Sequence, residues 1–131
     1  MATTLVGEAL NQGDEGMRAV AWVIKNRMVD PRWPDDCEKV CLQKYQFSCW
    51  NLSPWNLKNL HRMLMHTTKQ TKEWRRAREI GEKVMTLESV DPTKGANHYH
   101  TISLLGTKKQ PSWAEASKVT VQLNDHIFYK L

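Results

Sequence analysis

The sequence predicts an α+β fold that is mostly helical and carries a small β-hairpin, in a single domain over residues 1–131. Helical spacing of apolar residues dominates as far as Asp91, and the spacing becomes shorter after the turn at 91–95. A length of 131 residues is enough for one domain with its own core. With 40% hydrophobic and 25% charged residues the composition is that of an ordinary globular protein. No internal repeat or linker divides it.

Two helices are predicted at the start of the chain. Residues 3–12 form the first, with Thr3 or Thr4 as the N-cap, and Gly13 ends it. Asp14 is expected to cap the second helix, which is apolar on nearly every side and is therefore predicted to lie at the centre of the fold. Its inward positions follow the i, i+3, i+4, i+7 spacing and are Met17, Val20, Ala21, Ile24 and Met28, with Trp22 also in the core.

The middle of the chain predicts three further helices. A short one follows Pro34 and is capped by Asp35 or Asp36. Residues 44–54 show no clean period and are interpreted as a loop or a small irregular sheet. Helices are expected at about 55–67 and 70–88, and the second of these places Trp74, Ala77, Ile80, Val84 and Leu87 inward.

The last forty residues carry the β structure. Residues 91–95 form a turn, 97–101 are extended and 113–117 form one helical turn. The terminal hairpin consists of residues 119–123 and 126–130 on either side of Asn124-Asp125.

The net charge limits the classes of partner to expect, and the cysteine content bears on disulfide bonding. The net charge of +5 indicates an anionic partner, which could be nucleic acid, an anionic membrane or an anionic cell-wall polymer. Residues 69–78 are rich in basic residues, but these alternate with Glu73, Glu79 and Glu82, which favours a solvated helix face. We therefore expect no nucleic-acid partner. Three cysteines do not form a secreted disulfide framework and are expected to be reduced. No stretch reaches the roughly 18 apolar residues of a membrane span, so no stable membrane insertion is expected.

Motifs for nucleotides, metals and a serine nucleophile are not found. No glycine cluster of the phosphate-binding kind occurs. His98 and His100 share a strand face and could join His126, but this spacing matches no standard metal site. We therefore expect no metal and no cofactor. Ser48 is not flanked by the glycines of a nucleophile elbow.

Glu8 is the residue with the clearest potential for chemistry. It lies beside the most apolar helix of the chain, and a carboxylate there costs free energy unless it is paired, protonated or used. Apolar burial raises a carboxyl pKa and keeps the general acid of a glycosidase protonated near neutral pH. Spacing alone leaves a surface glutamate and a catalytic acid both open.

Five blocks of sequence resemble the catalytic domain of SleB-type cell wall hydrolases, a family that includes spore cortex-lytic enzymes and phage endolysins. They follow the family order and are 7–9 with 16–27, 37–40 with 46–50, 91–100, 111–114 and 126–129. Residues 119–125 depart from the pattern, because Leu123-Asn124-Asp125 stands where an Ile-Gly pair is expected before the histidine.

The resemblance implies a lysozyme-like fold that acts on peptidoglycan glycan strands, with Glu8 as the catalytic residue. The bond cut is the β-1,4 linkage between N-acetylmuramic acid and N-acetylglucosamine. Spore cortex relatives are lytic transglycosylases that leave a 1,6-anhydro-muramyl end. The chain is similar to small phage endolysins, and we expect a monomer. With no signal peptide recognised, it is expected to be made in the cytoplasm and to act on the cell wall, in the host periplasm or envelope.

A single-acid mechanism fits the residues, because Asp14 is expected to be a helix cap and Glu15 lies in a first helical turn where acidic residues are common. A hydrolytic muramidase, a cell-wall-binding module without activity and a nucleic-acid binder remain alternatives. Other residues in the family blocks are expected to support Glu8. Gln46 and Ser48 could bond the acetamido groups of the substrate, Phe47 could pack in the core or contact the ligand, and Tyr99 and His100 could line the cleft. Trp113 could stack on a sugar ring or pack in the core.

Overall fold

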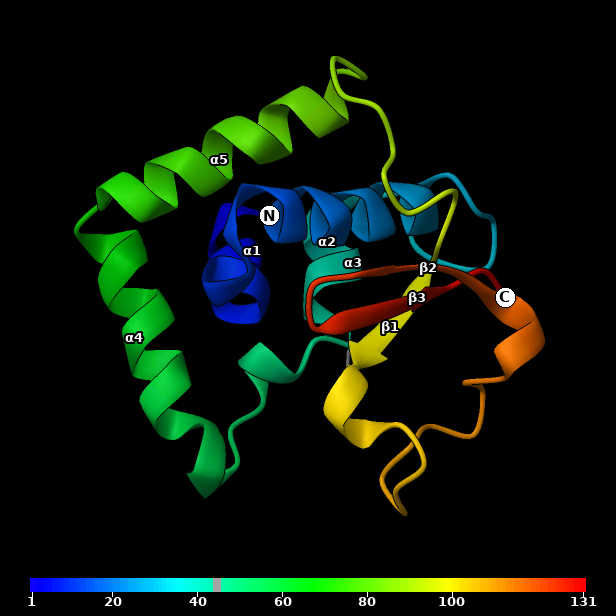
Figure 1. Cartoon of the computed structure of the whole chain (residues 1–131). Helices are drawn as coiled ribbons and strands as arrows, with labels where there is room; N and C mark the ends of the chain where they lie inside the picture. Colours follow the sequence, from blue (N-terminus) through cyan, green and yellow to red (C-terminus); the bar gives the residue numbers. More distant parts are fainter. Residues whose placement is uncertain (44–45) are drawn as a thin grey trace.

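The computed structural model describes residues 1–43 and 46–131. Helices make up one side of the molecule and a small sheet lies against α2, as Figure 1 shows. The helices are α1 (Ala2–Ala9), α2 (Gly13–Met28), α3 (Cys37–Leu42), α4 (Leu57–Thr68) and α5 (Lys72–Met85).

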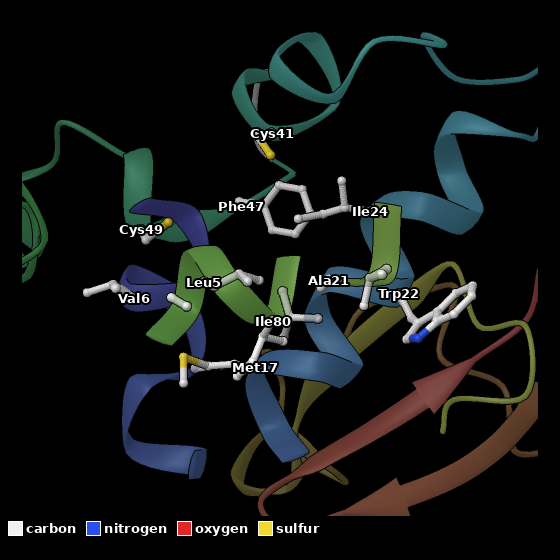
Figure 2. Close-up of a cluster of buried hydrophobic side chains, with 14 of the residues drawn as sticks. Leu5, Val6, Met17, Ala21, Trp22, Ile24, Cys41, Phe47, Cys49 and Ile80 are labelled. Atoms are coloured by element: carbon white, nitrogen blue, oxygen red, sulfur yellow. The ribbon is translucent and has the colours of Figure 1, made fainter. Parts of the chain in front are cut away.

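The main core lies between α1, α2 and α5 (Figure 2). Met17, Val20, Ala21 and Ile24 of α2 are buried as their spacing predicts, and Trp22 is buried with them. Met28, at the end of the helix, is only partly buried against the same core. From α5, Ile80 reaches the same cluster as Leu5 and Val6 of α1. The central position predicted for α2 is confirmed, because α1, α3 and α5 all pack on it.

The sheet combines the predicted hairpin with one further strand. Its strands are β1 (His98–Thr101), β2 (Val119–Leu123) and β3 (His126–Tyr129), and within the described residues they run antiparallel in the order β1-β3-β2. Every residue of the central strand β3 is buried. Phe128 packs with Ala96 against Ala19 and Val23 of α2, which fixes the sheet to the helical side.

Two predicted helix caps are wrong. α1 begins at Ala2 with Met1 as N-cap, because the Thr3 and Thr4 hydroxyls bond to the Trp74 and Trp50 indoles instead. α2 begins at Gly13 without a side-chain cap, and Asp14 binds Arg76. Between the helices lies the 3₁₀ turn η1 (Leu10–Gln12).

The α3 cap is confirmed, since the Asp36 carboxylate accepts a hydrogen bond from Lys39 N at 2.9 Å. Leu87 is not inward: α5 ends at Met85, and the Leu87 side chain is 66% exposed.

The irregular segment predicted at 44–54 contains 3₁₀ turns where the structure describes it. Residues 44 and 45 lie outside the described residues. From 46 onward the turns are η2 (Ser48–Trp50) and η3 (Pro54–Asn56), and the described part holds no strand. The short helical turn expected at 113–117 lies slightly later, as η5 (Ala116–Lys118). Another, η4 (Ile102–Leu104), follows β1 directly.

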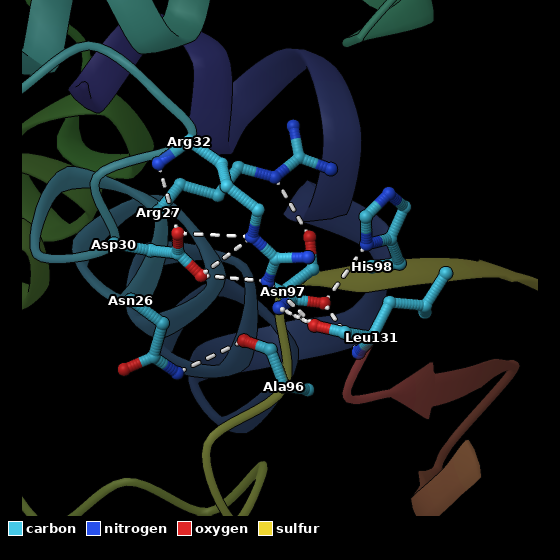
Figure 3. A network of polar contacts seen from close by, with 8 residues as sticks. All are labelled: Asn26, Arg27, Asp30, Arg32, Ala96, Asn97, His98 and Leu131. Atoms are coloured by element: carbon cyan, nitrogen blue, oxygen red, sulfur yellow. Dashed lines mark hydrogen bonds and ion pairs between the residues drawn. The ribbon is translucent and has the colours of Figure 1, made fainter.

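A polar network joins the end of α2 to the start of β1 (Figure 3). Arg27 is buried and its Nε donates to the Asn97 carbonyl at 2.7 Å. Asn26 donates to the Ala96 carbonyl at 2.9 Å. The Asn97 side chain in turn bonds both the backbone N–H and the carbonyl of Leu131. These bonds fix the backbone from which β1 begins, and with it the position of Tyr99.

Candidate active site

Glu8 lies in the last turn of α1, where segments from η2 and β1 meet it. Its side chain is partly buried. The Tyr99 hydroxyl of β1 donates a 2.7 Å hydrogen bond to Glu8 Oε1. The Ser48 hydroxyl of η2 makes a longer contact of 3.5 Å with Oε2. Both carboxyl oxygens are therefore held by side chains that are distant in sequence.

Gly7 explains why η2 can lie so close to α1. A Cβ at this position would lie 2.7 Å from Cys49 Cβ and 2.8 Å from Met63 Sδ. Real Cβ atoms do not approach other atoms so closely, so only glycine permits this packing. The glycine beside Glu8 thus allows Ser48 and Cys49 to reach the carboxylate.

Tyr99 is fixed by aromatic packing on several sides. Its ring centroid lies 4.9 Å from that of His126, 5.6 Å from Phe128 and 6.5 Å from Phe47. Burial and the neighbouring Glu8 raise the pKa of Tyr99 well above its usual range. The phenol therefore stays neutral and acts as a hydrogen-bond donor to Glu8.

The surroundings of Glu8 favour its protonated form. Burial among protein atoms raises the pKa of Glu8 above its ordinary value of 4.5, and the hydrogen bonds from Tyr99 and Ser48 offset only part of this. Burial also raises the pKa of the Cys49 thiol beside it, so the thiol is neutral. A carboxyl with a raised pKa at the wall of a cleft has the property required of a general acid.

A cleft of about 470 Å³ opens at Glu8, which is the size of a small-ligand site. Most of the residues that line it are polar, and they come from η1, the end of β1 with η4, and the β2–β3 turn. The lining residues are Glu8, Asn11, Gln12, Thr101, Ile102, Ser103, Asp125 and His126. Apart from Glu8, the sequence predicted none of these for substrate contact. His126 lies in the last family block, whereas Asp125 lies in the turn that departs from the family.

Ser48 and Tyr99 meet Glu8, but the other predicted binding residues have different contacts. Gln46 is exposed, and its Oε1 accepts a 2.8 Å hydrogen bond from Arg27 Nη1. Phe47 is buried in the main core, with the Arg27 guanidinium 5.3 Å from its ring centroid. Arg27 therefore holds both the segment before η2 and the start of β1.

His100 and Trp113 belong to an aromatic cluster behind the cleft. Both His100 ring nitrogens are engaged, one with the Thr101 carbonyl at 2.7 Å and the other with the Tyr129 hydroxyl at 2.8 Å. Trp113 packs edge-on against Tyr129 at 5.3 Å. Neither residue is among those that line the cleft.

The described residues contain neither a cluster of metal ligands nor a helix able to span a membrane. Across 1–43 and 46–131, no three His, Cys, Asp or Glu side chains lie together as a metal site would require. Over the same ranges the three cysteines form no disulfide. No helix of the described chain combines the length and apolar character needed to cross a membrane.

The comparisons agree with this architecture. The chain matches the family model "Cell Wall Hydrolase" over residues 11–129. It is similar to the catalytic domain of the germination-specific lytic transglycosylase SleB from Bacillus anthracis, at 21% identity and a TM-score of 0.69, covering 99% of this chain and 90% of that one. The Bacillus cereus SleB catalytic domain gives 18% identity and a TM-score of 0.59, covering 98% and 89%.

No curated protein sequence matches the chain. The family match covers far more than half of the chain, although Glu8 lies just before its first residue. The two structural matches extend over nearly all of the chain and show the lysozyme-like fold. The sequence blocks, the fold and the family match lead to one conclusion: the chain belongs to the cell wall hydrolase family and is a peptidoglycan-cleaving enzyme.

Proposed function

We propose that the chain is a lytic transglycosylase that cleaves the β-1,4 bond between N-acetylmuramic acid and N-acetylglucosamine, with Glu8 as its single acid and base. The observation that carries the proposal is the partly buried position of Glu8 at the wall of the cleft, where desolvation raises its pKa. The printed description of the Bacillus anthracis neighbour as a lytic transglycosylase supports the reaction type.

In the first step the protonated Glu8 carboxyl donates its proton to the glycosidic oxygen. The bond from the muramyl anomeric carbon to that oxygen breaks, and N-acetylglucosamine leaves with a free hydroxyl. Positive charge develops on the muramyl ring as an oxocarbenium-like ion. Tyr99 donates to the carboxylate that Glu8 then becomes, which stabilises the charged form at the stage when it is needed.

In the second step the Glu8 carboxylate removes the proton from the muramyl 6-hydroxyl. The 6-oxygen attacks its own anomeric carbon and closes the 1,6-anhydro ring. Glu8 ends the cycle protonated, and no water is consumed. The buried setting suits both steps, because the carboxylate produced in the first step is a stronger base than an exposed one.

A hydrolytic muramidase of the same fold is the second candidate, and one observation favours it. Asp125 places another carboxylate in the cleft that Glu8 lines. Hydrolysis normally uses a second carboxylate, about 5 to 9.5 Å from the acid, as nucleophile or water-activating base. In that reaction water takes the place of the 6-hydroxyl and leaves a reducing muramyl end.

Mass spectrometry of the muropeptides released from purified peptidoglycan tests both candidates. The transglycosylase proposal predicts 1,6-anhydro-muramyl ends from the parent protein and a severe loss of release from Glu8→Gln. Reducing muramyl ends would establish the muramidase instead. Equal release by the parent and Glu8→Gln would remove Glu8 from the chemistry, and no release by either would favour a cell-wall-binding module.

The biological role we propose is that of a small phage endolysin, as the sequence resemblance implies. An endolysin made in the cytoplasm needs a membrane pore to reach the wall. Bacteria expressing the chain should therefore lyse when a pore-forming protein is co-expressed and remain intact without it. Lysis without any pore would contradict this route.

A further inference from the structure

The turn between β2 and β3 is fixed against η1 and forms one wall of the cleft. Gln12 Oε1 accepts a 3.0 Å hydrogen bond from the backbone N–H of Asp125, and Gln12 Nε2 donates to Asp125 Oδ2 at 3.1 Å. Asn124 Nδ2 donates to the Gln12 carbonyl at 3.1 Å. On the other side, the Asp125 carbonyl accepts from the Ile102 N–H at 2.8 Å. The Asp125 backbone and one carboxyl oxygen are therefore held in place.

The carboxylate of Asp125 retains acceptor capacity. Among residues 1–43 and 46–131, no lysine, arginine or histidine forms an ion pair with it, and Gln12 Nε2 is the donor that its side chain meets. Burial lowers the pKa of the next residue, His126, although the charge of Asp125 acts in the opposite direction. A fixed carboxylate with a spare oxygen at a cleft wall is ready to accept hydrogen bonds from a ligand.

N-acetylhexosamines present suitable donors, namely ring hydroxyls and the acetamido N–H. A hydrogen bond from such a donor to a charged carboxylate is stronger than one between neutral groups. Thr101, Ser103 and Asn11 line the same cleft and add further polar contacts. The cleft volume of about 470 Å³ lies within the range of sites for small ligands.

We propose that Asp125 is a substrate-binding residue, which accepts a hydrogen bond from a hydroxyl or acetamido N–H of an N-acetylhexosamine bound beside Glu8. The inference rests on the proposed function, because it takes the glycan strand as the ligand. It assigns a role to the turn in which the chain departs from the SleB-type sequence pattern. The subsite is therefore a feature of this chain that the family resemblance does not supply.

Binding measured without turnover tests the inference directly. A GlcNAc–MurNAc tetrasaccharide is titrated calorimetrically into Glu8→Gln protein, with and without Asp125→Ala. Loss of a charge-assisted hydrogen bond should weaken binding about tenfold or more. Asp125→Glu should recover part of the affinity because it keeps a carboxylate. Asp35→Ala removes one negative charge at an exposed residue outside the cleft and should bind as the parent does.

Steady-state kinetics with Glu8 intact separates binding from chemistry. Asp125→Ala should raise KM with little change in kcat and with the same product ends. A fall in kcat at unchanged KM, a selective loss of reducing ends, or unchanged tetrasaccharide affinity in a variant that keeps the parent's Tm would overturn the inference. Failure of the proposed function is distinguishable, because it would appear as no Glu8-dependent release in the parent protein.

Discussion

Two carboxylates on either side of the bend between α1 and α2 have opposite environments. Glu8 at the end of α1 is packed among protein atoms, and burial raises its pKa. Asp14 in the first turn of α2 is 49% exposed in its side chain, and the Arg76 guanidinium at 2.7 Å lowers its pKa. The bend itself depends on Gly13, whose φ of +72° is readily adopted only by glycine.

The difference shows that two carboxylates six positions apart in the chain can have opposite roles, one chemical and one structural. Burial without a cation leaves Glu8 able to hold a proton that it can give away. Exposure with a cation leaves Asp14 ionised and occupied by its partner. Residue type alone did not distinguish them, since both are carboxylates near helix ends.

Replacing Glu8 should have the largest effect. Glu8→Gln keeps the size of the side chain but removes the proton donor, and general acid catalysis contributes about 10²- to 10⁴-fold to a rate. We expect kcat on purified peptidoglycan to fall by about that factor, measured as initial rates of muropeptide release. Asp14→Asn is the matched control and should keep the parent rate. Similar losses in both variants would break the comparison.

Gly7→Ala should damage the site through packing. The added Cβ would meet Cys49 and Met63 and displace η2 from α1, which overpacks the region at a cost of about 1–3 kcal/mol. We expect a lower midpoint in urea unfolding and roughly tenfold lower activity, because Ser48 moves with η2.

Gly81→Ala provides the control for Gly7→Ala. Gly81 is also helical, and its new Cβ would meet the flexible end of Met1, which can move aside. The control should therefore be close to neutral in stability and activity. Parent-like behaviour of Gly7→Ala would show that the close approach of η2 is not required.

Tyr99→Phe should change the pH dependence. The Tyr99 hydroxyl stabilises the ionised Glu8 and so lowers the pKa of Glu8. Without it that pKa rises further, and the acid stays protonated to higher pH. The basic limb of the kcat/KM profile should move up by about one pH unit. A shift to lower pH would contradict the assigned direction of this hydrogen bond.

The ionised form of Glu8 should also destabilise the folded protein at high pH. Its pKa in the folded state is raised above the ordinary 4.5, so the folded protein binds more protons than the unfolded chain between those two values. Stability is lost as pH rises through this window. Glu8→Gln should therefore raise Tm by a few degrees at about pH 8 and leave it nearly unchanged at about pH 4. Equal differences at both pH values would indicate another cause.

The Asp14–Arg76 pair should have the smallest effect. Both side chains are substantially exposed, and such pairs contribute about 0.2–1 kcal/mol. Asp14→Asn should lower the free energy of unfolding by no more than this, and less at high salt, as measured by urea unfolding at two ionic strengths. A loss of several kcal/mol would mean that the pair has a larger role than its exposure indicates.

The sequence predicts the elements with regular spacing well. The buried α2, the terminal hairpin and the Asp36 cap follow from local patterns that the structure bears out. The Thr3 and Asp14 caps fail because distant side chains, Trp74 and Arg76, take their oxygens. A rule for helix caps that uses only neighbouring residues does not take such distant partners into account.

Prediction of the site from sequence is limited in the same way, because contacts between distant residues are not visible in local patterns. Glu8 could be identified as a candidate site residue because a carboxylate beside an apolar helix is unusual. Tyr99 and Ser48 could be identified because they belong to family blocks. Gln12 and Asp125 could not be predicted as site residues, since they come together only where the hairpin turn packs on η1. The cleft role of His100 stays a prediction, and its ring bonds the Tyr129 hydroxyl of β3, a partner that the local sequence does not indicate.

Carbon-13 NMR titration of the Glu8 carboxyl, with Asp14 as an internal comparison, tests the central claim most directly. The account predicts a midpoint for Glu8 above 4.5 and one for Asp14 below 3.8 in the same sample. A Glu8 midpoint at or below 4.5 would mean that its surroundings do not favour the proton, and it would contradict the assignment of Glu8 as the general acid.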